Sequence, residues 1–367
     1  MLIRLLKSLL GSKPSAPPPA RPVRVQAAPA VDPKAEVLAR LAAYERGGQS
    51  AVSGVHLDHP GSRQAQDTPN EALDAVLARA RTLVTGELSA AAGQRVAAFR
   101  ELIGAGVPGS DGPAVFAFHA DLPADASIEY VDAKLNVRDF DYLGILRRFV
   151  RHAREHCPGV QVILATSAGS RYTVLAEEGV AVVELPLDLR QPMFERAVAV
   201  SAYLGSSAFR GNTAFLDSDA FVNRPLAEVF ALGFDLAFTY RQFSNMMPVN
   251  EGVFFASPRR AAAVGRFMLA RLATYERIAN DPAVQAYYGD VRRWRGGQLS
   301  LNAVCAPHLP YSPFRALHED DLVLRFLPCD TFNFALGDGE ALSSSARLGE
   351  RYVMHYKGPR KYALLDT

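Results

Sequence analysis

The segment Asn212-Thr-Ala-Phe-Leu-Asp-Ser-Asp-Ala-Phe-Val-Asn223 joins a short apolar run to two carboxylates one residue apart. The run 213–216 predicts a buried strand, and Asp217 and Asp219 follow where that strand would leave a sheet. In an open α/β fold, ligands bind beyond the carboxyl ends of the strands. Side chains two residues apart in an extended chain point the same way, so both carboxylates can face one ion.

Paired carboxylates at such a place indicate a site for a hard divalent cation. Mg²⁺ and Mn²⁺ prefer oxygen ligands, and they often join one or two carboxylates to the phosphates of a substrate. A solvated turn in which an aspartate caps the next element explains a D-x-D equally well when the motif stands alone. The metal interpretation therefore depends on motifs further along the chain.

Length and composition are those of a globular protein. A chain of 367 residues can form one large domain with an appendage, or two domains. The formal charge of +2 lacks the basic excess of a nucleic-acid binder, so we expect no nucleic-acid partner. The three cysteines lie far apart, which argues against a disulfide framework and a zinc site and fits a reducing compartment. They are Cys157, Cys305 and Cys329.

The first ten residues are apolar apart from Arg4, Lys7 and Ser8. They are far fewer than the roughly 20 residues that span a bilayer, and the two charges interrupt the apolar stretch that a secretion signal needs. A basic amphipathic helix on the inner face of a membrane and a frayed terminus both remain open interpretations. We therefore expect a cytoplasmic protein, and peripheral membrane contact through residues 1–10 stays open.

The sequence divides into three predicted regions. Residues 1–33 comprise the amphipathic start and a Pro-rich linker that we expect to be extended or disordered. Residues 34–110 form a predicted helical N-terminal region. From residue 111 to 367 strands alternate with helices, which predicts an α/β fold with a mainly parallel sheet and crossover helices.

Individual elements can be predicted within these regions. The predicted helices are 34–46, 70–87, 90–103, 142–156, 193–204 and 258–278. The last begins with Ser257 as its cap and Pro258 at its first position. The predicted strands are 114–118, 160–164, 180–185, 213–216, 235–240 and 252–256.

Four further motifs follow the D-x-D. They are Asn250-Glu-Gly-Val-Phe-Phe-Ala256, a strand; Gly297-Gln-Leu-Ser-Leu-Asn302, which opens a helix; Leu327-Pro-Cys-Asp-Thr-Phe-Asn333, a short strand leading into a loop; and His355-Tyr-Lys-Gly-Pro-Arg-Lys361. With these motifs the sequence resembles the GT-A-fold glycosyltransferases, most closely the retaining family that contains glycogenin and bacterial lipopolysaccharide galactosyl- and glucosyltransferases. That family shows D-x-D, N-x-G-V/I, D-Q-x-x-x-N, L-P-x-x-W/F-N and H-x-x-G-x-x-K in this order. The resemblance covers residues 114–361.

The resemblance implies a role for each matching residue. Asp217, Asp219 and His355 would bind Mn²⁺ or Mg²⁺, which holds the nucleotide diphosphate. Gln298 would lie beneath the anomeric carbon of the donor sugar, and Asn250 would line the same sugar. Further contacts to the nucleotide sugar would come from His119, Asp121, Arg196, Ser218, Gly358 and Lys361, with His119 or Asp121 at the place where the nucleotide base is held. Among them, Lys361 would contact the diphosphate, and Gly358 would allow a close approach of the backbone.

The sequence also departs from the family. The acidic residue usual before the motif glutamine is Gly297, which removes a contact to a sugar hydroxyl and leaves the donor sugar open. Lys361 is followed by Tyr-Ala instead of Pro-Trp, and the loop 120–137 differs from the usual one. We therefore expect a divergent relative.

The expected function is transfer of a sugar, such as a hexose, from a nucleotide-diphosphate sugar to a saccharide or lipid-linked acceptor. By analogy the anomeric configuration is retained, and because no carboxylate is evidently placed as a covalent nucleophile, we expect front-face attack. A divalent metal would offset the charge that develops on the leaving diphosphate. The aromatic residues Tyr287, Tyr288 and Trp294 either stack an acceptor sugar or pack in the ordinary way.

Two alternatives compete with this function. The first is a HAD-type phosphatase, because Phe215-Leu-Asp-Ser-Asp-Ala-Phe221 resembles its nucleophile loop. Several elements precede the motif, however, and Phe221 replaces the usual Thr or Val. The second alternative is a catalytically inactive relative that binds a sugar or a protein. The presence of all three metal-ligand candidates and of Lys361 argues against it.

Overall fold

A computed structural model describes most of the chain from residue 71 on. The described residues are 32, 34, 35, 38, 71–122, 141–241, 247–309, 311, 317–319, 321–335 and 349–356. The chain forms two compact units, Met1–Asp32 and Pro33–Thr367, and every element named below belongs to the second. The predicted amphipathic start, the Pro-rich linker, most of the predicted helix 34–46, and the motif residues Gly358 and Lys361 lie outside the described residues.

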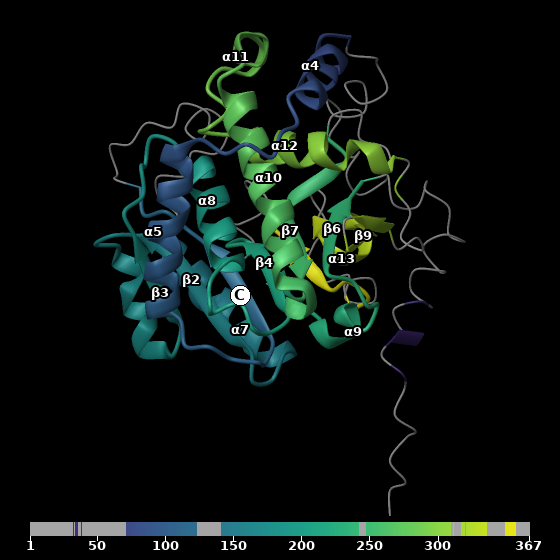
Figure 1. Cartoon of the computed structure of the whole chain (residues 1–367). Coiled ribbons are helices and arrows are strands. Elements are labelled where there is room, and N and C mark those ends of the chain that lie inside the picture. The colour runs from purple at the N-terminus through teal and green to yellow at the C-terminus, as the bar shows by residue number, and fades with distance from the viewer. Residues whose placement is uncertain are drawn as a thin grey trace, which may run out of the picture. The chain divides into compact units, whose positions relative to one another are not determined.

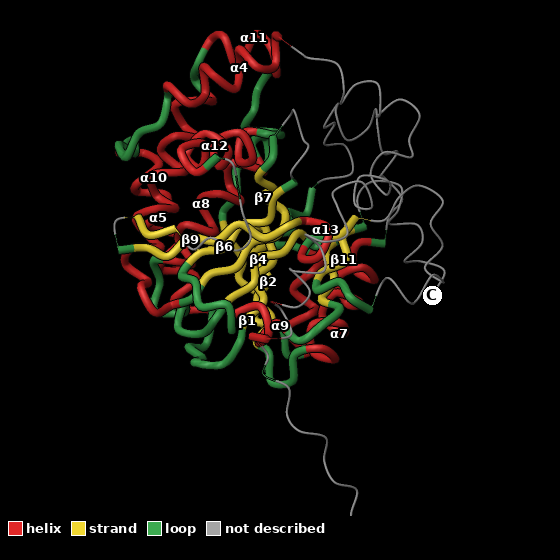
Figure 2. Tube along the Cα trace, turned by 90° about the vertical axis from the view of Figure 1, so that its right-hand side faces the viewer, coloured by secondary structure: helices red, strands yellow, loops and turns green. Residues whose placement is uncertain are grey.

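The centre of the second unit is an eight-stranded sheet (Figures 1 and 2). Its strands are β1 Ala114–Phe118, β2 Gln161–Ser167, β3 Ala181–Leu185, β4 Thr213–Asp217, β6 Leu236–Tyr240, β7 Val249–Ala256, β8 Leu317–Glu319 and β9 Leu322–Pro328. They lie in the order β3-β2-β1-β4-β7-β6-β9-β8, and only β7 and β8 pair with their neighbours in antiparallel fashion. The predicted α/β fold, with a mainly parallel sheet flanked by helices, is therefore confirmed.

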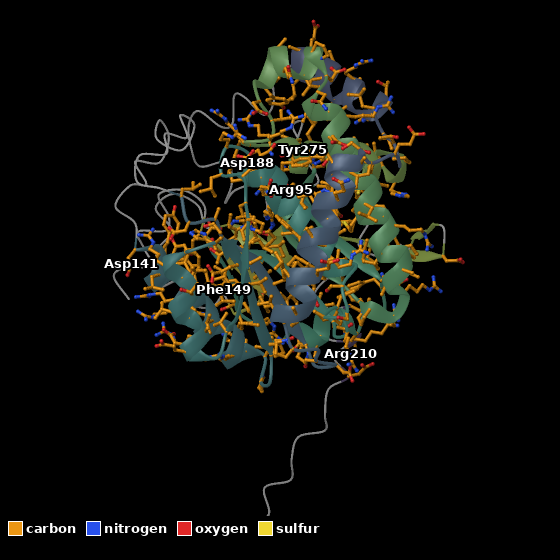
Figure 3. All side chains as sticks on the ribbon, turned by 60° about the vertical axis from the view of Figure 1, so that its left-hand side comes forward. Arg95, Asp141, Phe149, Asp188, Arg210 and Tyr275 are labelled. Atoms are coloured by element: carbon orange, nitrogen blue, oxygen red, sulfur yellow. The ribbon has the colours of Figure 1, made fainter. Side chains whose placement is uncertain are left out.

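Helices cover both faces of this sheet because successive strand residues point to opposite sides. Phe116 belongs to a core shared with α5 Ala90–Gly106, α8 Pro192–Leu204, α10 Ala261–Ala279 and α12 Gly296–Cys305. Its neighbour Val115 belongs to a second core, shared with α7 Tyr142–His156 and α9 Leu226–Phe230. Figure 3 labels a residue of each core, Tyr275 of α10 and Phe149 of α7. None of the helices in the described ranges is both long enough and apolar enough to cross a bilayer.

The helix predicted at 70–87 is shorter in the structure, where α4 spans Glu71–Thr82, and the helix predicted at 90–103 is α5, which continues to Gly106. The buried side chains of α5, including Val96 and Phe99, join the first core. Arg95 of α5, labelled in Figure 3, pairs with the buried Glu195 of α8 at 2.8 Å. The boundary predicted after residue 110 stays a prediction.

Two other predicted elements differ from the structure. The helix expected at 258–278 begins as a 3-10 turn, Pro258–Arg260, and the Ser257 side chain makes no capping bond. The Ser257 backbone instead donates to the Asp235 carbonyl at 2.8 Å, which extends the pairing of β6 with β7. The strand expected to begin at Leu327 begins earlier, as β9, and a short helix, α13 Cys329–Phe332, follows it where a loop was predicted.

A second, small sheet was not predicted. It contains β5 Ala220–Val222, β10 Phe334–Ala335 and β11 Val353–His355, in the order β10-β11-β5. Strands of two or three residues are too short to show an alternating pattern. This sheet nevertheless brings β11 next to the D-x-D, because β11 pairs with the strand that directly follows the motif.

The central sheet offers a test of its packing. The rings of Phe215 on β4 and Phe254 on β7 stack with centroids 4.3 Å apart, and both are buried. We expect Phe254→Ala to lower the free energy of unfolding by about 3–5 kcal/mol, because the cavity cannot fully collapse. Leu102→Ala, at an exposed position of α5, should change it by less than about 0.5 kcal/mol. Urea denaturation measures both, and equal values for the two variants would contradict the packing.

Candidate functional site

Three side chains converge at the carboxyl end of β4. The His355 Nε2 atom lies 3.1 Å from Asp219 Oδ1 and 3.7 Å from Asp217 Oδ2. One potential ligand atom from each of the three residues lies within 4.8 Å of the other two. The sequence places His355 136 residues after Asp219, and the fold brings them together.

The small sheet explains this convergence. Asp217 ends β4, and after a turn at Ser218 and Asp219 the chain continues as β5. His355 of β11 stands opposite Ala220 of β5, and the Tyr356 backbone donates to the Asp219 carbonyl at 2.9 Å. The imidazole is therefore held beside the carboxylates by backbone pairing.

Arg196 of α8 lies beside the same carboxylates. Its Nη2 atom is 2.8 Å from Asp217 Oδ1, and its Nη1 atom is 3.2 Å from Glu251 Oε1. Burial alone lowers the pKa of this guanidinium, but Asp217, Glu251 and Asp219 outweigh burial and raise it. Arg196 therefore stays charged, and Asp217 presents one oxygen to Arg196 and the other toward His355.

Glu251 is a buried acidic residue that the sequence analysis missed. Its Oε1 atom also pairs with Arg271 of α10, which in turn donates to the Gly297 carbonyl at 2.9 Å. Residues 251–253 form a bulge, since Thr239 of β6 faces Asn250 whereas Phe238 faces Phe254. A bulge next to a site re-aims side chains, and here it turns Glu251 toward Arg196.

The carboxylate of Glu251 occupies the space that a side chain at position 297 would need. A Cβ atom added to Gly297 would lie less than 3.0 Å from the Glu251 carboxyl carbon and both of its oxygens. The missing acidic residue at 297 therefore does not leave this place without a carboxylate. In the sequence, the departure at Gly297 shows only that the usual acidic residue is absent from this position. It does not indicate that Glu251 lies there.

His119 and Asp121, predicted to hold the base, follow β1. His119 Nδ1 lies 3.0 Å from Ser218 Oγ, so the structure brings His119 to the D-x-D. The imidazole also contacts the rings of Tyr142 and Tyr172, with centroids 4.8 and 4.9 Å away. The Asp121 carboxylate turns instead to Arg171, whose backbone N–H and Nε atoms lie 2.9 and 3.2 Å from it.

Asn250 and Gln298 approach the site from β7 and α12. The Asn250 carboxamide oxygen accepts hydrogen bonds from the Gly252 backbone and from Asn333, both at 2.8 Å. The Gln298 side chain donates to the Met247 carbonyl at 3.4 Å. Gln298 lies in the first turn of α12, next to Gly297 and thus beside Glu251.

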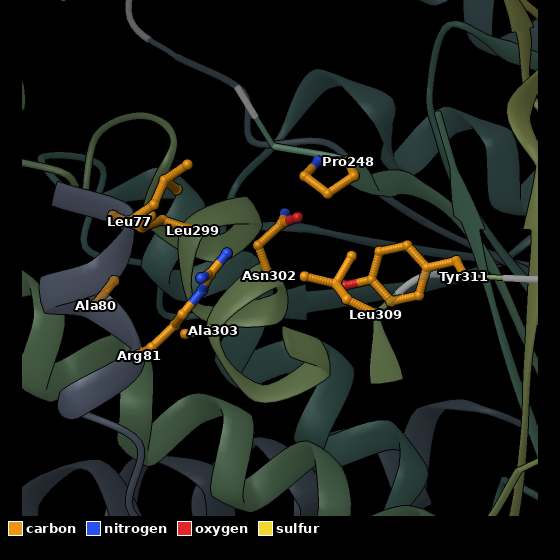
Figure 4. A pocket seen from close by; sticks show the side chains of 9 residues that line it. All are labelled: Leu77, Ala80, Arg81, Pro248, Leu299, Asn302, Ala303, Leu309 and Tyr311. Atoms are coloured by element: carbon orange, nitrogen blue, oxygen red, sulfur yellow. The ribbon is translucent and has the colours of Figure 1, made fainter. Parts of the chain in front are cut away.

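Asn302, the last residue of the Gln298 motif, ties α12 to β7. Its carboxamide accepts from the Val249 N–H at 2.9 Å and donates to the Val249 carbonyl at 2.8 Å, as a neighbouring strand would. It also donates to the Gln298 carbonyl at 2.8 Å. Figure 4 shows Asn302 beside Pro248, in a small pocket lined by α4 and α12. The tie keeps Gln298 beside the strand that carries Asn250.

The donor set fits a divalent cation. Asn333 Oδ1 lies 2.8 Å from His355 Nδ1, which leaves Nε2 as the ring nitrogen that faces the carboxylates. Carboxylate oxygens and a neutral imidazole nitrogen are accepted ligands of Mn²⁺. Glu251, Asp217 and Asp219 also exceed Arg196 and Arg271 by one charge. The site therefore has the ligands and the negative charge for Mn²⁺ or Mg²⁺.

Comparison with known proteins found distant structural similarity. No protein-family model and no curated protein matches the sequence. A glycosyltransferase involved in the glycosylation of the major capsid of PBCV-1 matches over 70% of this chain and 98% of its own, at 11% identity and a TM-score of 0.37. GlyE of Streptococcus pneumoniae TIGR4 matches over 68% of this chain and 55% of its own, at 13% identity and a TM-score of 0.39. The galactosyltransferase LgtC matches over 67% of this chain and 87% of its own, at 13% identity and a TM-score of 0.35.

All three of these structures are glycosyltransferases. The LgtC structure is a complex with donor and acceptor sugar analogs. At these identities and TM-scores the matches do not assign an activity or a residue's role. The assignment of a function therefore depends on the site itself.

The contact between Glu251 and Gly297 can be tested by a double-mutant cycle. In the wild-type background, Gly297→Ala should cost about 1–3 kcal/mol of unfolding free energy, because the added methyl overlaps the carboxylate. In a Glu251→Ala background the same change should become favourable, by up to about 1 kcal/mol, because Ala is the better helix former. Chemical denaturation of the four proteins gives the coupling. An equal cost in both backgrounds would place Glu251 elsewhere.

Proposed function

We propose that this protein is a metal-dependent glycosyltransferase. It moves a sugar, such as a hexose, from a nucleotide-diphosphate sugar to a saccharide or lipid-linked acceptor. The observation that carries the proposal is the convergence of Asp217, Asp219 and His355 at the carboxyl edge of a mainly parallel sheet. This edge is where open α/β sheets bind their ligands.

The charged groups at this edge suit a diphosphate leaving group. Bound by Asp217, Asp219 and His355, Mn²⁺ or Mg²⁺ supplies Lewis-acid stabilisation of the charge that develops on the leaving diphosphate. Arg196 holds one oxygen of Asp217 and so fixes the direction of the other. The proposed Lys361 would add a second positive charge on the diphosphate, and Gly358 would let the backbone come close.

The base and sugar ends of the donor lie on opposite sides of the metal ligands in this proposal. The base would lie against His119 and Tyr142, whose partly exposed rings offer a stacking surface, while the buried ring of Tyr172 supports His119 edge-on. Asp121 and Ser218 belong to the same end. The sugar would lie toward Asn250 and Gln298.

Retention by front-face attack is the proposed course. A double displacement needs a carboxylate positioned to attack the anomeric carbon. Glu251 is a buried carboxylate beside Gly297, the neighbour of Gln298, and one of its oxygens pairs with two guanidinium groups. Such pairing makes a carboxylate a weaker nucleophile, which disfavours the covalent course. Retention rests on the family resemblance alone.

The other proposals for the ligands are less constrained. Tyr287 and Trp294 expose 39% and 42% of their surface, as a surface that stacks an acceptor sugar would. A lipid-linked acceptor would give residues 1–10 a membrane to contact. The cytoplasmic location also remains a proposal.

The two alternative functions have less support. In a phosphatase of the HAD type the first aspartate of the motif attacks phosphorus. Here Asp217 is held by Arg196 on one oxygen and faces His355 with the other, and no observation among the described residues favours such an attack. A catalytically inactive relative can be distinguished from a transferase only by measuring turnover of the donor.

Metal-dependent turnover tests the proposed function. Nucleotide sugars are first screened for Mn²⁺-dependent thermal stabilisation, since a ligand at 100 times its Kd adds about 2.7 kcal/mol. Hydrolysis of the stabilising donor is then measured with and without Mn²⁺. Asp219→Ala and His355→Ala should abolish it, because each removes a ligand. Asp111→Ala, an exposed carboxylate before β1, should leave it unchanged. Full turnover in either ligand variant would refute the site.

The role of Lys361 has a separate test. Lys361→Ala should weaken binding of the donor or its nucleoside diphosphate by about 1.5–3 kcal/mol, the worth of a hydrogen bond to a charged group. Titration calorimetry in the presence of Mn²⁺ measures this loss. Acceptor affinity serves as the internal control and should not change. An unchanged donor Kd would remove Lys361 from the site.

A further inference from the structure

We propose that Asn250 and Asn333 form a positioning relay that fixes the tautomer of His355. In this relay the proton sits on Nδ1, and the lone pair of Nε2 faces Asp217 and Asp219. The inference deepens the proposed function, because it takes Nε2 to be a metal ligand. It assigns a positioning role to Asn333, the last residue of the motif 327–333, for which the resemblance implied no role. It also assigns a positioning role to Asn250.

The relay starts at a backbone N–H group, which can act only as a hydrogen-bond donor. The backbone N–H of Gly252 points at Asn250 Oδ1 over 2.8 Å. A backbone amide only donates, so the atom of Asn250 that faces it must be the carbonyl oxygen. The orientation of the Asn250 carboxamide is thereby set by the main chain.

The orientation of the Asn333 carboxamide is set in turn by two neighbours, Asn250 and Thr239. Its Nδ2 atom donates to Asn250 Oδ1 at 2.8 Å and to Thr239 Oγ1 at 3.1 Å. The hydroxyl of Thr239 already uses its single hydrogen on the Val253 carbonyl, at 2.8 Å, and so can only accept. Both neighbours of Nδ2 are therefore acceptors, and a flipped Asn333 would set oxygen against oxygen at two places.

The last step reaches the imidazole. With its NH₂ group committed, Asn333 presents Oδ1 to His355 Nδ1 at 2.8 Å. A carbonyl oxygen only accepts, so Nδ1 must carry the hydrogen. In the neutral ring, Nε2 then turns its lone pair to Asp219 Oδ1 and Asp217 Oδ2, at 3.1 and 3.7 Å. Three acceptor atoms meeting in this way call for a cation among them.

Because the residues of the relay are buried, the imidazole of His355 has no alternative to this hydrogen-bond pattern. Thr239 and Asn333 expose none of their surface and His355 exposes 2%. Water therefore has no room to replace a lost partner, and an unpaired polar group is costly there. Gly252 also limits the space, because an added Cβ would lie 2.5 Å from Asp217 Oδ2 and 2.9 Å from His355 Cε1. The glycine that starts the relay thus also makes room for two of the ligands.

Nuclear magnetic resonance reads the tautomer directly. Protein labelled with ¹⁵N-histidine, free of metal and at alkaline pH, gives the protonation of each ring nitrogen from its ¹⁵N shift, and His355→Gln assigns the signal. We expect a proton on Nδ1 of His355. A bare Nδ1 with the proton on Nε2 would overturn the relay. This reading needs no metal, so it stands apart from the proposed function.

Metal affinity gives the second readout. Asn333→Leu keeps the size but removes the acceptor, and we expect the Kd of Mn²⁺, measured by electron paramagnetic resonance, to rise about 10–100-fold. Thr213→Val removes a buried hydroxyl at the far end of β4 and should leave that Kd unchanged. Equal Mn²⁺ affinity of Asn333→Leu and the wild type would overturn the relay. A wild-type protein that binds no Mn²⁺ would instead refute the metal-dependent function, and the tautomer reading would still decide the relay.

Discussion

The site depends on keeping three carboxylates close together, of which that of Glu251 is buried and those of Asp217 and Asp219 are partly exposed. Buried carboxylates are stable only when positive charge or hydrogen-bond donors compensate them. Arg196 and Arg271 provide this compensation for Glu251 and for one oxygen of Asp217. The remaining oxygens of Asp217 and Asp219 face an imidazole that presents a lone pair in the proposed tautomer. Negative charge is therefore concentrated at one point, and a divalent cation is the species that suits it.

Close backbone approach is the second requirement. Gly252 lies against Asp217 and His355, and Gly297 lies against Glu251, so neither position has room for a side chain. In both cases the absence of a side chain on the glycine leaves room for a functional group that comes from another element. The bulge in β7 adds to this, since it moves residues 251–253 out of register with β6. Irregular strand geometry and two glycines thus build the site on an otherwise regular sheet.

These features explain which parts could be predicted from the sequence. Strands β1 to β4, β6 and β7 and helix α7 follow from local apolar patterns, so β4 and its two aspartates were found at the expected sheet edge. The three short strands carry no such pattern, and the pairing of His355 opposite Ala220 is long-range information. Only the family motifs pointed to His355. Glu251 and Arg271 could not be predicted, because their partners come from α8, α10 and α12, and no local signal records such contacts.

The exchange at position 297 shows why residue-by-residue comparison can mislead at such a site. Taken by itself, Gly297 indicates that an acidic group is lost and that the donor sugar loses a contact. In space, the Glu251 carboxylate lies less than 3.0 Å from where the Cβ of residue 297 would be. An acid carried by β7 and paired with two arginines is less mobile than one on the first turn of α12, because both guanidinium groups are themselves buried. The loss of an acidic residue from a motif therefore does not imply the loss of negative charge from the site.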